Sequence, residues 1–174
     1  MNRLSVLKTT YEILDKVTPL RLDCGKLCEQ ACCKGGNEDN GMLLFPGEEE
    51  LLANQDEWLT LTPIDHIRSN IYIARCNGTC PRFLRLLSCR IFPLTPYLTE
   101  NDILIIKMDP RAKQLCPLAR EMDKKDLLPE FTKAVRKASA LLITESSIKA
   151  YIYDLSRMLD EYTNLPWYQV MNES

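Results

Sequence analysis

The sequence predicts one α+β domain over residues 1–174, mainly helical, with short strands around a cysteine-rich region and a helical C-terminal part. Three observations favour this class. Apolar residues recur at helical spacing near both ends of the chain, two short apolar runs have the length of strands, and the cysteines lie in the first two thirds. The length is that of one domain.

Composition excludes several classes of protein. With 45% hydrophobic and 26% charged residues, the chain is too apolar and too balanced in charge for an intrinsically disordered segment. A formal net charge of −2 provides no overall basic field, so we expect no nucleic-acid partner. No apolar run approaches the ~20 residues that cross a bilayer, so we expect no membrane segment.

The first predicted element is an amphipathic helix over residues 4–17 that packs on the core. Its apolar face follows helical spacing, and Pro19 closes the segment. The residues of that face are Leu4, Leu7, Tyr11, Leu14 and Thr18.

A short strand over Met42 to Phe45 and a helix from Glu48 to about Trp58 are expected next. Pro46-Gly47 separates the two. The helix opens with three glutamates, Glu48 to Glu50, and acidic side chains in a first turn interact favourably with the helix dipole. We therefore interpret them as helix-start residues rather than as a metal site.

Two more strands follow. Ile71 to Ile73 belongs to a strand that enters Cys76, and Ile103 to Lys107 is a buried strand that ends at Asp109-Pro110.

The tail, residues 120–165, contains two predicted helices, and Pro166 ends the second. Lys133, Arg136 and Lys137 form the solvated face of the first helix. The apolar faces are Phe131, Val135, Ala138 and Leu142 in the first helix and Ile148, Ile152, Leu155 and Leu159 in the second.

Cysteine is the unusual feature of the composition. The first residues of the chain carry charges within their apolar pattern, so we expect no signal peptide and a reduced, cytoplasmic location. In that compartment clustered thiols indicate metal or redox chemistry rather than disulfides. The eight cysteines are Cys24, Cys28, Cys32, Cys33, Cys76, Cys80, Cys89 and Cys116.

The first cluster cannot serve one metal ion from a straight helix. Cys24 and Cys32 would then lie ~12 Å apart along the axis, because the rise is ~1.5 Å per residue. Either the segment wraps round a metal as a loop, or its cysteines divide between centres. Cys32 and Cys33 are adjacent and point in different directions in any regular structure.

The second cluster holds a turn. Asn77-Gly78 lies between Cys76 and Cys80, and this dipeptide favours a tight turn that brings the two thiols together. Pro81 stiffens the exit. Soft thiolates suit zinc and iron–sulfur clusters, so the spacing predicts a metal knuckle.

The order of these motifs resembles the YkgJ-type (CxxCxxCC) family of zinc- or iron-chelating proteins. The resemblance covers residues 22–118, which we take as the cysteine-rich metal-binding region. The first block is also similar to the cysteine-rich start of flagellin lysine-N-methylases, which are regarded as iron–sulfur proteins. The residues that match are the block ending in Cys32-Cys33, then Cys80-Pro-Arg-Phe-Leu, then Cys89-Arg-Ile-Phe-Pro.

The chain also departs from the family pattern. Three residues rather than two separate the cysteines at the start of the first block, and Cys76 is additional. The resemblance implies that six cysteines are metal ligands, and Cys76 and Cys116 join them by spacing and composition. The six are Cys24, Cys28, Cys32, Cys33, Cys80 and Cys89.

Arg90 and Pro93 match the Cys-Arg-x-Phe-Pro segment of the family. Arg90 is expected either to supply charge and hydrogen bonds near the bound thiolates or to form a surface salt bridge. His66, the single histidine, is more simply a non-ligand, and turn or cap roles account for Asp65, Asp102 and Asp109.

The expected function is a metal-binding protein that holds zinc or an iron–sulfur cluster through cysteine thiolates. Two alternatives stay open: a metal-dependent protein-modifying enzyme similar to the lysine methylases, and a thiol-redox or disulfide protein without metal. The expected partner is the metal ion or cluster, and a protein partner stays open.

Overall fold

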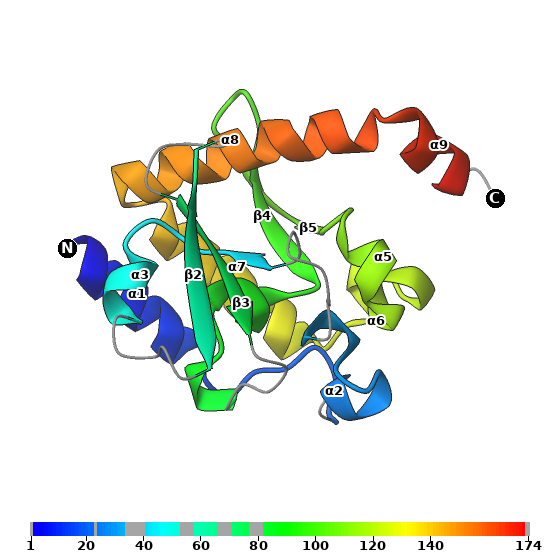
Figure 1. The fold of residues 1–174 in the computed structure, drawn as a ribbon, viewed down its shortest axis with the longest axis horizontal. Helices are drawn as coiled ribbons and strands as arrows, with labels where there is room; N and C mark the ends of the chain where they lie inside the picture. Colours follow the sequence, from blue (N-terminus) through cyan, green and yellow to red (C-terminus); the bar gives the residue numbers. More distant parts are fainter. Residues whose placement is uncertain are drawn as a thin grey trace.

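The computed structural model describes residues 2–22, 24–33, 41–52, 58–65, 71–76 and 82–172, and within them it shows the expected α+β fold with a helical C-terminal part (Figure 1). Every helix in this described part of the chain is too short or too polar to cross a lipid bilayer. The helices are α1 (Arg3–Ile13), α2 (Cys24–Leu27), α3 (Glu48–Leu51), α4 (Leu87–Ile91), α5 (Ala112–Leu115), α6 (Pro117–Glu121), α7 (Pro129–Leu142), α8 (Ser146–Thr163) and α9 (Pro166–Asn172). The strands are β1 (Met42–Leu43), β2 (Leu59–Ile64), β3 (Ile71–Cys76), β4 (Leu94–Leu98) and β5 (Leu104–Met108), and three 3-10 turns are η1 (Ala31–Cys33), η2 (Arg82–Leu84) and η3 (Lys124–Asp126).

Helix α1 confirms the predicted N-terminal helix, although it ends at Ile13 instead of residue 17. Asn2 caps it by accepting a hydrogen bond from the backbone N–H of Ser5 at 2.9 Å. Val6 and Leu7 are fully buried, and α1 packs on α7. The amphipathic pattern therefore marks a core-facing helix.

The first sheet is antiparallel, with strand order β1-β3-β2. Strands β1 and β3 fall on the predicted runs, and Leu43 pairs with Ile73. Strand β2 was not predicted, because Pro63 interrupts its pattern. Proline lacks the N–H that a central strand must donate, and β2 is an edge strand, where such a residue is tolerated.

Helix α3 begins at Glu48 as predicted but is much shorter than the predicted helix. Leu52 already caps it, and Trp58 lies in a turn before β2. Trp58 packs against the small core around Leu44, as expected for a packing residue. Residues 53–57 lie outside the described part of the chain.

The second sheet pairs β4 with β5, from Leu94 opposite Met108 to Leu98 opposite Leu104. The run predicted from Ile103 is β5 shifted by one residue, and it is only half buried. Ile106 faces the core at 3% exposure, whereas Ile103 is 58% exposed. Strand β4 was not predicted, because prolines flank and interrupt it.

Helices α7 and α8 match the predicted tail helices, and their predicted apolar residues are buried. Lys133, Arg136 and Lys137 are exposed as expected. Helix α8 packs on β4, and α7 packs on α1 and β5, so the tail shares one core with the rest of the chain. Pro166 follows the end of α8 and begins α9, a helix that the sequence did not predict.

Candidate functional site

The first cysteine block forms a compact, reversed loop. Helix α2 is a single turn that begins at Cys24, and the backbone N–H of Cys28 donates to its carbonyl at 3.2 Å. Glu29 and Gln30 then adopt positive φ angles of 50° and 60°, and Gln30 N–H donates back to the carbonyl of Gly25 at 2.9 Å. The block is therefore not a straight helix between Cys24 and Cys32.

This loop places two of its cysteines beside one from a distant segment. Cys24, Cys32 and Cys89 line one small pocket of about 50 Å³, together with Met42 and Phe92. This volume is far below that of pockets for organic ligands, which are typically some hundreds of Å³, so the space suits an ion or a compact cluster. Thiols separated by more than fifty residues in the sequence thus face a common volume.

Cys116 approaches the same loop from another side. It lies between α5 and α6, is 7% exposed and carries a free thiol. Burial raises the pKa of the Cys116 thiol, and the nearby thiols of Cys32 and Cys28 raise it further. Figure 1 shows α2 beside α6, which agrees with this proximity.

Cys89 is held by the anchoring of α4. Leu87 and Ile91 on this helix are buried. The backbone N–H of Leu87 donates to Glu48 Oε1 at 2.7 Å. Glu48 is completely buried and also accepts from the Tyr11 hydroxyl at 2.5 Å and from the Phe45 backbone N–H at 3.0 Å.

Glu48 begins α3 as predicted, and its buried carboxyl has a second role that the sequence did not indicate. Burial raises the pKa of the Glu48 carboxyl, while the hydrogen bonds from Tyr11, Leu87 and Phe45 act in the opposite direction. This carboxyl joins α1, α3 and α4, and so it positions the segment that carries Cys89.

Arg90 secures the backbone on the other side of Cys89. Its side chain is only 8% exposed, and it donates from Nε to the carbonyl of Arg85 at 2.8 Å and from Nη2 to the carbonyl of Phe83 at 2.7 Å. It also pairs with Asp15 at 3.5 Å and lies 4.9 Å from the centroid of the Tyr11 ring. These contacts are more extensive than those of a surface salt bridge, and they hold η2 against α4.

The remaining predicted site residues lie away from this pocket or outside the described residues. Cys76 ends β3 opposite Leu59, packs against the small core around Leu44 and does not line the pocket. The side chain of Cys33 and all of Cys80, Pro81 and His66 lie outside the described residues.

Two of the three aspartates named from the sequence, Asp102 and Asp109, have structural partners. Asp109 pairs with Arg111 at 2.6 Å, and Asp102 pairs with Lys149 at 3.0 Å. Asp102 also adopts a positive φ of 59°, and the backbone N–H of Asp109 donates to the carbonyl of Pro93 at 2.8 Å. These contacts agree with the turn roles expected from the sequence.

Three cysteines line this pocket, and their sulfur atoms suit a thiophilic metal; Gln30 and Arg85 line it as well. Within the ranges that the structure describes, no three cysteine, histidine, aspartate or glutamate side chains are arranged closely enough to hold a metal ion. Cys24, Cys32 and Cys89 therefore line a common pocket but do not form a coordination shell by themselves.

The cavity beside this pocket was missed by the sequence reasoning. Its lining is mostly apolar, and its polar residues include Ser88 of α4, Arg111 just before α5 and Tyr151 of α8. The sequence predicted Asp109-Pro110 only as the end of a strand. It predicted the apolar faces of α7 and α8 only as packing surfaces. The residues converge only in the tertiary structure.

The chain matches no protein-family model, no curated protein and no solved structure.

Proposed function

We propose that this chain is a cytoplasmic protein that binds zinc or an iron–sulfur cluster through cysteine thiolates. The observation that carries the proposal is the small pocket lined by Cys24, Cys32 and Cys89. Three thiols from two separate segments line this one small space, together with Gln30 and Arg85. The resemblance to the YkgJ-type family, which rests on the sequence motifs, implies the same kind of ligand.

The ligand set is inferred from position. Cys24, Cys32 and Cys89 line the pocket, and Cys116 is close enough to Cys28 and Cys32 for their charges to affect it. Four thiolates complete a zinc site or one iron–sulfur cluster. The eight cysteines permit two such centres. Cys33, Cys76 and Cys80 are the candidates for the remaining positions.

Arg90 has a positioning role in this proposal. Its guanidinium holds the carbonyls of Phe83 and Arg85, which lie between the Cys80 segment and Cys89. Groups that fix the backbone next to a ligand orient the ligand and influence metal affinity.

The test is elemental analysis of protein purified without oxygen, with acid-labile sulfide measured beside iron and with a visible absorption spectrum. Zinc binding gives a colourless protein with zinc and no sulfide, whereas an iron–sulfur centre gives coloured protein with both iron and sulfide. Metal content far below one atom per chain, after supply of both metals, contradicts the proposal.

Single substitutions then identify the ligands. Cys32→Ser and Cys89→Ser should lower metal content and thermal stability together, because metal binding contributes folding free energy. Lys26→Ala is the matched control, since Lys26 is an exposed residue of α2 within the same loop. Equal metal content in all three variants would remove both cysteines from the ligand set.

The thiol-redox alternative is separated by thiol titration before and after a chelator. Thiols that a metal protects become reactive when the metal is removed, whereas bridged sulfurs stay unreactive. For the enzyme alternative, the measurement is the coordination number of the bound metal. A catalytic metal keeps an open position, and a closed four-thiolate shell argues against catalysis at that metal.

A further inference from the structure

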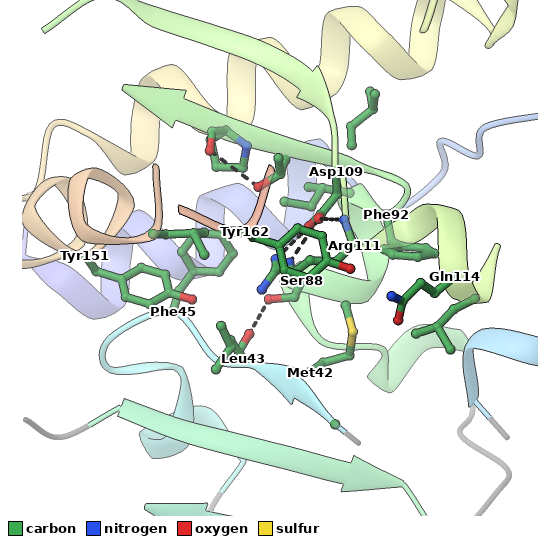
Figure 2. Close-up of a pocket in the computed structure, with 17 residues that line it drawn as sticks. Met42, Leu43, Phe45, Ser88, Phe92, Asp109, Arg111, Gln114, Tyr151 and Tyr162 are labelled. Carbon is green, nitrogen blue, oxygen red and sulfur yellow. Dashed lines mark hydrogen bonds and ion pairs between the residues drawn. The ribbon is translucent and has the colours of Figure 1, made fainter. Parts of the chain in front are cut away.

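A larger cavity lies next to the cysteine pocket and has different chemistry. Its volume is about 260 Å³, and residues from β1, β4, α4, α5 and α8 form its walls (Figure 2). Met42 and Phe92 line both spaces. The two spaces therefore share part of a wall, although no cysteine lines the larger one.

One wall carries an arginine whose geometry is fixed by its neighbour. Arg111 donates from Nε to Asp109 Oδ1 at 3.0 Å and from Nη2 to Asp109 Oδ2 at 2.6 Å. The Asp109 side chain is 7% exposed, and its Oδ1 also accepts the Arg111 backbone N–H at 2.9 Å. Asp109 thus occupies one edge of the guanidinium plane and holds it in place.

The other edge of the guanidinium remains available to a ligand. A guanidinium has five N–H donors, and Asp109 uses two of them. The remaining donors, on Nη1 and the second N–H of Nη2, make no hydrogen bond to any residue in the described ranges. Two parallel donors of this kind fit a planar head group with two acceptor lone pairs.

A second donor faces the cavity from α8. Tyr151 is 1% exposed, and its ring packs edge-on against Phe45 with centroids 5.6 Å apart. Within the described part of the chain its hydroxyl makes no hydrogen bond. Figure 2 shows this hydroxyl turned toward the middle of the cavity, where Arg111 lies.

The Tyr151 hydroxyl lines the cavity and can donate a hydrogen bond to an acceptor that is bound there. Burial also raises the pKa of Tyr151, so the hydroxyl keeps its proton at neutral pH and can donate it in a hydrogen bond.

The charge and the apolar walls restrict the ligand further. Asp109 neutralises Arg111, so the cavity has little net charge, which disfavours a multiply charged phosphate more than a singly charged or neutral head group. Phe45, Leu94 and Leu155 provide apolar surface, and the volume admits only a small molecule.

We propose that this cavity binds a small organic molecule with an apolar body and one carboxylate or carboxamide head, whose oxygen accepts hydrogen bonds from Arg111 and from the Tyr151 hydroxyl. The binding does not require metal at the cysteines. The carboxylate and carboxamide share the same acceptor geometry, and the experiment separates them.

The test is fluorine NMR of the full chain with three probes of similar size: 4-fluorophenylacetate, 4-fluorophenylacetamide and 4-fluorophenethylamine. Saturable binding of the acid or the amide, with weaker binding of the cationic amine, is the expected result. Binding of the acid alone identifies a carboxylate site, and binding of the amide alone a carboxamide site. Absence of saturable binding for both, or an amine that binds equally well, overturns the proposal.

The variant Tyr151→Phe tests the proposed donor. This variant should lower the affinity for the probe by about three- to tenfold, which is the effect of one hydrogen bond. Its melting temperature should be unchanged or higher. Tyr153→Phe on the same helix is the matched control, because Tyr153 packs on the main core and does not line the cavity. Wild-type affinity in a folded Tyr151→Phe protein overturns the role of this hydroxyl.

Arg111→Lys provides an independent measurement that keeps the charge and removes the planar pair of donors. The affinity for the acid or amide should fall in this variant. An Arg111→Lys protein that unfolds leaves the comparison of the three probes on the wild-type chain as the deciding result.

Discussion

The hydroxyl of Tyr11 donates a hydrogen bond to Glu48 Oε1 at 2.5 Å, across 37 residues of sequence and between two helices. The same oxygen accepts the backbone N–H of Leu87, which begins the helix that carries Cys89. A single buried carboxyl therefore connects the N-terminal helix with the candidate metal site.

Removal of this carboxyl should destabilise the protein strongly. Glu48→Ala leaves the backbone N–H groups of Phe45 and Leu87 buried without acceptors, and each costs ~1–3 kcal/mol, so we expect a loss of about 2–5 kcal/mol. Urea unfolding measures it. Glu50→Ala is the control, because Glu50 is exposed and its ion pair with Arg3 should contribute less than ~1 kcal/mol. Equal stability of the two variants would show that the Glu48 contacts contribute little.

The titration of Glu48 should make stability depend on pH. Burial raises its pKa in the folded state above the ordinary value of 4.5, so the folded protein keeps the Glu48 proton at pH values where the unfolded chain has lost it. The stability from this group is fully present below 4.5 and is lost as the pH rises through the folded-state pKa.

The measurement compares urea unfolding of wild type and Glu48→Gln from about pH 4 to pH 7. Glutamine does not titrate, so wild type should lose stability relative to this variant as the pH rises. Parallel pH profiles would contradict a raised pKa at Glu48.

Substitution of Arg90 should loosen the segment before Cys89. Arg90→Lys loses the paired donors to the carbonyls of Phe83 and Arg85, and we expect a cost of ~1–3 kcal/mol because these acceptors are then poorly satisfied. Chemical denaturation and hydrogen exchange at residues 83–91 are the measurements. Arg120→Lys, an exposed residue of α6, should stay within ~0.5 kcal/mol of wild type. An Arg90 variant as stable as this control would mean that the carbonyls find other partners.

Removal of bound metal should lower the melting temperature under reducing conditions. Metal ligation stabilises the folded state that presents the ligands, so a chelator should destabilise wild type but have little effect on a Cys116→Ala protein that no longer binds metal at that site. Cys116→Ala without a chelator should cost little through packing, because the two side chains are similar in volume. If no chelator changes the melting temperature of a protein shown to contain metal, metal binding does not stabilise the fold and the prediction is contradicted.

The elements with regular apolar spacing were predictable from the sequence. Helices α7 and α8 repeat their apolar residues at helical intervals, and that spacing by itself requires one buried face. Strand β3 was equally clear. Strands β2 and β4 were not, because Pro63 and Pro96 disrupt the pattern, and both prolines are tolerated only because of where their strands lie in the sheets.

The sequence by itself predicted the thiol chemistry of the candidate site, because clustered thiols favour soft metals. Only the tertiary structure decided which thiols meet. Positive φ angles at Glu29 and Gln30, which neither side chain predicts, turn the first block back on itself. The burial of Glu48 and the cavity beside Arg111 depend on contacts between elements that are distant in the sequence. Local sequence patterns do not predict such contacts.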